Sequence, residues 1–255
     1  MPSVHLVQLD MPWEDKAASH ARVGALLDAA EINAGDLILL PEMFDTGFSL
    51  NVSTTADVDR ASADFLASLA ADTNAYVQGG ITVPEPDAGW AKNRSLTFDP
   101  TGACIAQYDK IHPFTYGREP ECFRPGTDVT TFEWAGLCVC PVICYDLRFP
   151  ELFRAGLEAG AEMFTVIANW PSPRREHWRT LLHARAIENQ AFVAAVNRTG
   201  NDPHLPYAGD SLVIDPKGEI VVDADAAEGV VSASIDGAAL RDWRAEFPAW
   251  KDRRL

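Results

Sequence analysis

Basic side chains are scarce in this sequence. Its 255 residues contain 21 Lys and Arg against 37 Asp and Glu, which gives a formal net charge of −16. An excess of negative charge repels phosphate backbones and anionic lipid headgroups. We therefore expect neither nucleic acid nor a membrane surface as a partner.

Long apolar runs are also lacking. No run approaches the ~20 residues that a membrane-spanning helix needs, and residues 1–8 lack the basic segment and long apolar region of a secretory signal. The five cysteines are an odd number in a chain too large to depend on disulfides, which suits a reducing compartment. These features predict a cytoplasmic protein.

The sequence contains no linker, low-complexity segment or convincing internal repeat. Its Pro and Gly residues are scattered through short turns, and 47% of the residues are apolar, enough for a substantial core. We expect residues 1–255 to form a single domain.

Hydrophobic periodicity alternates between strand-like and helix-like segments. Strands are predicted at residues 4–9, 36–40, 76–83, 93–99, 104–108, 137–143, 162–167, 192–197, 211–215, 219–223 and 230–235. Helices are predicted at residues 13–32, 57–72, 150–160 and 174–190. Because helices recur between strands in both halves, we expect a layered α/β protein with buried sheets.

The apolar run at residues 137–143 ends on Cys144 and turns at once into charged residues. Its length is typical of a core strand, and Pro150 with Glu151 resembles the first turn of a helix. Backbone N–H groups and the helix dipole at such a junction lower the pKa of a thiol, and the thiolate is the form that attacks. The alternative is that Cys144 is only a small buried hydrophobic residue.

Two further loops follow predicted strands and carry residues that nucleophilic amide chemistry needs. Glu42 comes directly after an apolar strand and is suited to taking a proton from a thiol, although it could equally be a solvated loop carboxylate. Lys110 closes the predicted hairpin and, if it points inward, puts a positive charge near a developing oxyanion; otherwise it is a surface charge. His112 is a second candidate base, or a loop residue with its hydrogen bonds satisfied, and we place it after Glu42.

A third loop, residues 117–126, is bounded by Gly and Pro and is suited to fold over a pocket. Either Glu119 or Glu121 could pair with Lys110 and hold its amine in place. The alternative is an ordinary charged loop.

Together these stretches resemble the nitrilase superfamily of carbon–nitrogen hydrolases, in its omega-amidase-like branch, over nearly the whole chain. The resemblance is carried by Leu-Pro-Glu-Met-Phe-Asp-Thr-Gly-Phe around Glu42, Tyr-Asp-Lys-Ile-His around Lys110, Cys-Tyr-Asp-Leu-Arg-Phe-Pro-Glu from Cys144, Ala168-Asn169-Trp170-Pro171, residues 184–190 and Gly209-Asp210-Ser211.

The resemblance implies a four-layer α-β-β-α sandwich and a Glu-Lys-Cys triad of Glu42, Lys110 and Cys144. It selects Glu119 as the second glutamate, and it assigns the oxyanion hole to Lys110 and the backbone N–H of Tyr145. The implied activity is hydrolysis of a primary amide through a thioester, without metal or organic cofactor. A metal site at Cys138, Cys140 and Cys144 is the weaker alternative, because no well-placed fourth ligand is evident.

Several arginines lie in or near these loops in an otherwise acidic protein: Arg118, Arg124, Arg148, Arg174 and Arg175. They predict a substrate that carries a carboxylate, as the ω-amide of a dicarboxylic or 2-oxo acid does. Equally, Arg148 could pair with Asp146 or Glu151 and the others could be solvated. We assign Arg118, Arg148, Arg174, Asn169 and Trp170 to substrate binding, while His177 and Trp178 either border the pocket or belong to the core.

Other functions remain open at this stage. The same chemistry serves nitriles, N-carbamoyl compounds and deaminated glutathione, and a non-catalytic ligand-binding relative would keep the fold. The resemblance also implies a homodimer or larger homo-oligomer, with Trp243, Phe247 and Trp250 as candidates for a buried interface.

Overall fold

The computed structural model describes residues 1–87 and 89–254. The strands of the first sheet are β1 (Ser3–Gln8), β2 (Leu37–Leu39), β3 (Tyr76–Pro84), β4 (Ala91–Phe98), β5 (Cys104–Asp109) and β14 (Gly229–Ser234). Those of the second are β6 (Phe132–Trp134), β7 (Leu137–Ile143), β8 (Met163–Ala168), β9 (Phe192–Asn197), β12 (Leu212–Ile214) and β13 (Ile220–Asp223). A separate hairpin is formed by β10 (Thr199–Asn201) and β11 (Pro206–Ala208). The helices are α1 (Lys16–Leu27), α2 (Val52–Thr55), α3 (Ala61–Thr73), α4 (Pro150–Glu158), α5 (Arg175–Asn189) and α6 (Gly237–Glu246).

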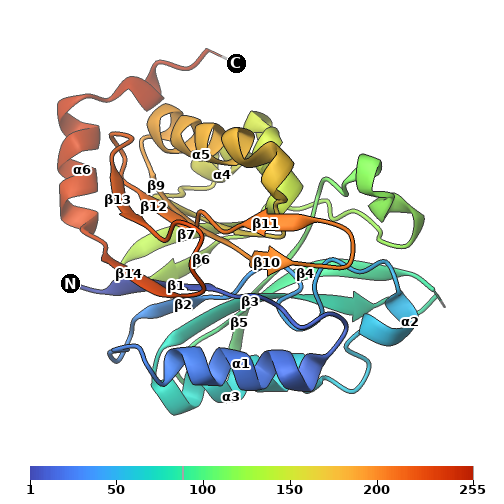
Figure 1. Cartoon of the computed structure of the whole chain (residues 1–255). Coiled ribbons are helices and arrows are strands. Elements are labelled where there is room, and N and C mark those ends of the chain that lie inside the picture. Colours follow the sequence, from blue (N-terminus) through green and yellow to red (C-terminus); the bar gives the residue numbers. More distant parts are fainter. Residues whose placement is uncertain (88, 255) are drawn as a thin grey trace.

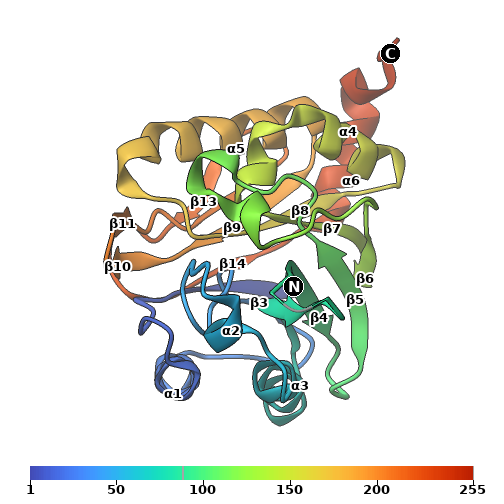
Figure 2. The same ribbon diagram turned by 90° about the vertical axis from the view of Figure 1, so that its right-hand side faces the viewer.

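The two six-stranded sheets lie face to face between two layers of helices (Figure 1). Helices α1 and α3 cover the outer face of the first sheet, and α4 and α5 cover the second, as the view in Figure 2 also shows. The strand orders are β14-β1-β2-β3-β4-β5 and β13-β12-β9-β8-β7-β6. This arrangement confirms the predicted α-β-β-α sandwich.

Strand β1 shows how the alternation of side chains builds the layers. Val4 and Leu6 belong to the apolar cluster between the sheets, whereas Val7 packs in the cluster beneath α1 and α3. Both faces of this strand are therefore buried, and its polar residues His5 and Gln8 are buried as well.

Several segments differ from the sequence-based expectation, and helix α2 and strand β6 were not predicted at all. The first helix starts at Lys16, because Asp15 caps it by accepting from the Ala18 N–H, and it ends at Leu27 rather than residue 32. The β10–β11 hairpin was not predicted, since its strands are only three residues long. Helix α6 was also missed, and the Asp236 side chain caps its start.

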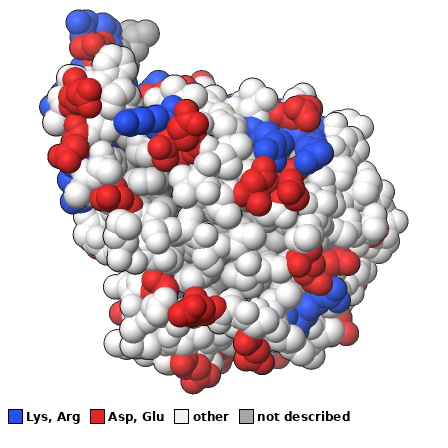
Figure 3. All heavy atoms as spheres, turned by 60° about the vertical axis from the view of Figure 1, so that its left-hand side comes forward, with Lys and Arg blue, Asp and Glu red and all other residues white. Residues whose placement is uncertain are grey.

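On the face in Figure 3, basic side chains lie mostly beside acidic ones and form no continuous patch. Elsewhere most arginines are likewise paired, for example Arg241 with Glu162 at 2.8 Å. Within the described residues, no helix is long and apolar enough to span a bilayer.

Candidate active site

Four strand ends meet at one place between the sheets. Glu42 follows β2, Lys110 follows β5, Cys144 follows β7 and Asn169 follows β8. Parallel strands place their carboxyl ends at the same edge of a sheet, so residues far apart in sequence are brought together. All four residues were named from the sequence, with Glu42, Lys110 and Cys144 as catalytic candidates and Asn169 as a substrate-binding candidate. The contacts of Asn169 with Glu42 are described below.

Lys110 lies between two buried carboxylates. Its Nζ is 2.8 Å from Oε1 of Glu42 and 2.9 Å from Oε2 of Glu119. All three side chains are at most 1% exposed. Burial alone would lower the pKa of Lys110, but the charges of Glu119 and Glu42 raise it well above its ordinary value. The lysine therefore stays charged inside the protein.

Three hydrogen-bond donors orient the buried Glu42 carboxylate. Its Oε1 accepts from Lys110 and, at 2.7 Å, from Nδ2 of Asn93, while Oε2 accepts from the Asn169 N–H at 2.9 Å. The Asn169 side-chain amide also donates to the Glu42 carbonyl. Asn93 was not predicted as a site residue, because a polar residue within a strand carries no local signal of its partner.

Glu119 and Glu121 have different environments. Burial raises the pKa of Glu119, and the charge of Lys110 opposes that rise. Asn93 also donates to Glu119, at 2.9 Å, and so bridges the two buried carboxylates. Glu121 instead points to solvent and pairs with Arg118 at 2.7 Å. The structure thus places Glu119, not Glu121, beside Lys110.

Cys144 occupies a strained turn. It starts the 3₁₀ turn Cys144–Arg148 with φ +47°, in the left-handed region that costs most residues free energy. Burial first, and the Glu42 carboxylate second, raise the pKa of the Cys144 thiol well above its ordinary value. The expected lowering by a helix dipole was wrong, since α4 begins only at Pro150. A thiol whose pKa is raised keeps its proton more firmly, so a nucleophilic role for Cys144 would require a base beside it.

Asp146 ties the Cys144 turn to the Lys110 segment. Its Oδ2 accepts from the Tyr108 hydroxyl at 2.7 Å and from the Ile143 N–H at 3.2 Å. Its Oδ1 accepts from the backbone N–H of His112 and lies 2.8 Å from His112 Nδ1. His112 also stacks on Phe149, with ring centroids 3.7 Å apart. The His112 ring thus belongs to this clamp, and Glu42 is the carboxylate beside Cys144.

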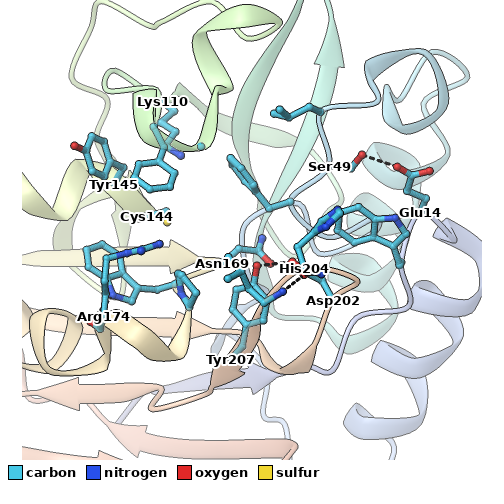
Figure 4. Close-up of a pocket in the computed structure, with 18 of the residues that line it drawn as sticks. Glu14, Ser49, Lys110, Cys144, Tyr145, Asn169, Arg174, Asp202, His204 and Tyr207 are labelled. Atoms are coloured by element: carbon cyan, nitrogen blue, oxygen red, sulfur yellow. Dashed lines mark hydrogen bonds between the residues drawn. The ribbon is translucent and has the colours of Figure 1, made fainter.

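A cavity of about 440 Å³ opens over Cys144 (Figure 4). Lys110, Tyr145, Asn169 and Trp170 line it near the thiol. Of the predicted arginines, Arg148 and Arg174 line it as well.

Arg148 and Arg174 have no carboxylate within 4 Å among the described residues, so the pairing of Arg148 with Asp146 or Glu151 was wrong. Arg148 lies over the Trp170 ring at 4.7 Å, and burial lowers its pKa. Arg174 lies over the Phe114 ring at 5.4 Å. Both cations are therefore available to an anionic ligand.

The other predicted arginines are engaged elsewhere. Arg118 pairs with Glu121 outside the cavity, so its assignment to substrate binding was wrong. Arg124 pairs with Asp87 and Arg175 with Asp210. His177 lies 3.3 Å from Arg148, and Trp178 is buried with its N–H donating to the Asp210 carbonyl.

The weaker alternative, a metal site at Cys138, Cys140 and Cys144, finds no support in the described residues. Cys140 is buried, and its sulfur lies against Gly156, while Cys144 faces the cavity. Within residues 1–87 and 89–254, no three His, Cys, Asp or Glu side chains are close enough to share a metal ion.

The half of the cavity farther from Cys144 was not predicted from the sequence. It is formed by loop residues that include Trp13, Glu14, Ser49, Asp202 and His204, and Tyr207 of β11 lies beside them. Figure 4 shows Glu14, Ser49 and His204 on the side away from Lys110, Cys144 and Tyr145, with Asn169 between them. None of these residues follows a long predicted strand, so no strand-end signal marked them.

Comparison with known proteins agrees with this geometry. The family model described as carbon-nitrogen hydrolase matches residues 3–245. The omega-amidase YafV of Escherichia coli K12 is 37% identical, over 99% of this chain and 97% of the relative, and the 2-oxoglutaramate amidase of Bacillus subtilis is 34% identical, over 99% and 97%. A solved structure from Xanthomonas campestris, a CN-hydrolase superfamily protein with an arsenic adduct in its active site, superposes with a TM-score of 0.93 at 38% identity and covers 100% of this chain and 97% of that one.

Proposed function

Because this chain belongs to the carbon–nitrogen hydrolase family, we propose that it hydrolyses the ω-amide of a dicarboxylic or 2-oxo acid to the free acid and ammonia. The observation that carries this proposal is the buried Glu42–Lys110–Glu119 cluster beside Cys144, at a cavity that is also lined by two arginines with no carboxylate partner among the described residues. The relatives named omega-amidase and 2-oxoglutaramate amidase support the same substrate class.

Acylation begins with the thiol proton. Glu42 takes the proton from Cys144, and the sulfur attacks the amide carbonyl carbon, so that an S–C bond forms. The negative charge that develops on the oxygen is stabilised by the Lys110 ammonium and the Tyr145 N–H. When the tetrahedral intermediate collapses, the C–N bond breaks, and Glu42 returns the proton to the departing nitrogen. The products are ammonia and a thioester.

Deacylation repeats these roles with water. Glu42 removes a proton from water, the oxygen attacks the thioester, and the same two donors hold the oxyanion. The C–S bond then breaks, and the proton returns from Glu42 to the sulfur. Glu119 keeps the Lys110 amine in position, since it is the second carboxylate at 2.9 Å.

Arg148 and Arg174 are proposed to bind the substrate carboxylate. Both line the cavity near Cys144, and an arginine binds a carboxylate through two parallel hydrogen bonds. Asn169 and Trp170 line the same cavity, and the Trp170 ring lies under the Arg148 guanidinium at 4.7 Å.

The test is ammonia release by the wild type and by Cys144→Ala. The panel contains succinamate, glutaramate, 2-oxoglutaramate, deaminated glutathione, a simple nitrile and an N-carbamoyl amine. We expect release from the ω-amides that disappears in Cys144→Ala. Turnover confined to the other compounds would keep the catalytic cluster and overturn the substrate class, whereas no turnover of any compound would favour a ligand-binding protein.

We also propose that the chain forms a homodimer or larger assembly in the cytoplasm and unfolds as a single domain. Ile187, Ile220, Val221 and Phe247 expose apolar side chains near the end of α5, and a second subunit could cover them. Light scattering should give at least twice the mass of 27.8 kDa. Cell fractionation tests the location, and a single cooperative unfolding transition tests the domain prediction.

A further inference from the structure

The cavity is larger than a short ω-amide requires. A five-carbon ω-amide has about ten heavy atoms and fills at most ~300 Å³, even if each atom takes the ~30 Å³ of a water molecule in the liquid. The cavity measures about 440 Å³. Once such a substrate is bound at Cys144, part of the cavity therefore remains for a longer molecule.

The remaining part has an apolar wall. Trp13, Leu50 and Leu205 line it, and the Trp13 ring meets the ring of His204 edge-on with centroids 5.8 Å apart. This contact joins the loop before α1 to the β10–β11 hairpin. A methylene chain can therefore pack along this wall and remove apolar surface from water.

Glu14 supplies a fixed carboxylate to this part of the cavity (Figure 4). Its backbone has φ +53° and its N–H donates to the Thr46 carbonyl at 2.9 Å. Its side chain accepts from the Ser49 hydroxyl at 2.6 Å and from the Asn51 amide at 3.3 Å. In the described part of the chain, no Lys, Arg or His nitrogen lies within 4.0 Å of this carboxylate.

Asp202, the other carboxylate here, accepts three hydrogen bonds from its own hairpin. It accepts from the backbone N–H groups of His204 and Leu205 at 2.7 Å each, and from the Tyr207 hydroxyl at 2.6 Å. These bonds hold the hairpin loop together. Glu14 accepts two hydrogen bonds against three for Asp202, so it has more capacity left to accept one from a ligand.

We propose that Trp13, Glu14, Ser49 and Leu205 form a distal subsite for an extended primary amide whose far end carries an ammonium group. The Glu14 carboxylate would accept a charge-assisted hydrogen bond from the ammonium, and the adjacent Trp13 ring would add a cation–π contact. The cavity would thus have opposite charges at its two ends, arginines near the thiol and a glutamate away from it. This inference rests on the proposed amide hydrolysis at Cys144.

The test compares amides that differ only at the far end. For chains of four, six and eight carbons, kcat/KM is measured for the ω-amino amide and for the unsubstituted amide, for example 6-aminohexanamide beside hexanamide. We expect the wild type to prefer the ammonium compound by about fivefold or more at one chain length. That length reports how far Glu14 lies from the thiol.

Variants assign the preference to Glu14. In Glu14→Gln the ratio of the two kcat/KM values should fall to about one, and in Ser49→Ala it should fall partway, because the carboxylate loses its anchor. Glu246→Gln, on the exposed surface of α6, should keep the wild-type ratio. Thermal melting shows whether each variant is folded, and Ser49→Ala provides an independent reading if Glu14→Gln is not.

Glutaramate hydrolysis by the wild type separates the two proposals. If glutaramate is hydrolysed but no chain length shows an ammonium preference, or none of the longer amides is turned over, the distal subsite is overturned while the proposed function stands. If the longer amides show the Glu14-dependent preference and glutaramate is not hydrolysed, the substrate class under the proposed function fails and the subsite stands.

Discussion

The two halves of the cavity are built from different parts of the chain. The half around Cys144 uses side chains that follow strands, together with Glu119 from the loop after β5, and Glu42, Lys110 and Glu119 are almost fully buried there. The distal half uses loops, in which Trp13 and Glu14 are partly exposed and His204 is exposed. Covalent chemistry needs atoms fixed by a rigid scaffold, whereas loops can vary in sequence without disturbing the sheets. The residues proposed for the reaction and those proposed to contact a longer substrate therefore belong to different parts of the chain.

We expect the largest loss of activity and stability from removing the buried cation, Lys110. In Lys110→Met, Glu42 and Glu119 face each other unpaired, so we expect kcat/KM to fall by about 10³-fold or more and stability to fall by about 3–5 kcal/mol. The stability loss should be smaller at pH 5 than at pH 8, because a protonated carboxyl relieves the repulsion. Ammonia release and urea unfolding measure these effects.

Lys92→Met is the matched control, since Lys92 lies on the neighbouring strand β4 and donates at the surface to the Pro125 carbonyl. It should change both quantities little. Retention of a tenth or more of wild-type activity in Lys110→Met would contradict the oxyanion-hole role that we propose for Lys110.

A smaller loss is expected from loosening the clamp under the nucleophile. Asn at position 146 cannot accept from all of Tyr108, Ile143 and His112, because its amide nitrogen only donates. We expect Asp146→Asn to lower kcat by about 30-fold with little change in KM, and to slow alkylation of Cys144 by iodoacetamide across the pH range. Asp242→Asn on α6 is the control. A rise in KM alone would show that Asp146 acts on binding instead.

Variants of the arginines test whether the half of the cavity around Cys144 prefers substrates that carry a negative charge. Arg148→Gln should raise KM for glutaramate about tenfold with a smaller change in kcat, because the substrate carboxylate loses a bidentate partner. The effect on neutral butyramide should be much smaller. Arg118→Gln, which lies outside the cavity, should behave as wild type. Equal losses on glutaramate and butyramide would argue that Arg148 only supports Trp170.

The smallest effect on activity is expected at Asp45, which lies three residues after Glu42. Burial raises the pKa of Asp45 to about 6, so the folded protein keeps a proton that the unfolded chain releases near pH 4. Stability is therefore lost as pH rises from about 4 to about 6, by on the order of 2–3 kcal/mol, and the loss persists above pH 6.

Asp45→Asn should remove this loss and raise the melting temperature more at pH 7.5 than at pH 4.5. The exposed Asp59→Asn variant controls for net charge. A melting temperature for Asp45→Asn that is equal to or below the wild-type value at pH 7.5 would show that the Asp45 carboxylate is well stabilised by Ser62 and its other neighbours.

Much of the fold was predictable because its signals are local. The long apolar runs of β7, β8 and β9 mark buried parallel strands, and the core elements lie close to their predicted residues. Short strands such as β10 and β11 gave too little periodicity to be detected. The first helix was predicted too long at both ends. At its start, Glu14 has a positive φ, which cannot continue a helix and which the hydrophobic pattern does not reveal.

The candidate site was predictable to the extent that it follows strands. Glu42, Lys110 and Cys144 each come directly after one, and the resemblance to a known family added Glu119. The assignments that depended on distant partners were less reliable. Arg118 and Arg148 look alike in the sequence, yet Arg118 pairs with Glu121 at the surface, whereas Arg148 lies over Trp170 with no carboxylate within 4 Å among the described residues.

The sequence by itself determined the layered architecture, the excess of acidic charge and the residue types that stand at the strand ends. Only the tertiary structure decided that His112 binds Asp146, that Asn93 bridges the two carboxylates, and that Glu14 reaches the same cavity as Cys144. The physical reason is that periodicity and turn chemistry act over a few residues. The partner of a buried polar group is instead set by packing between segments that can be more than a hundred residues apart.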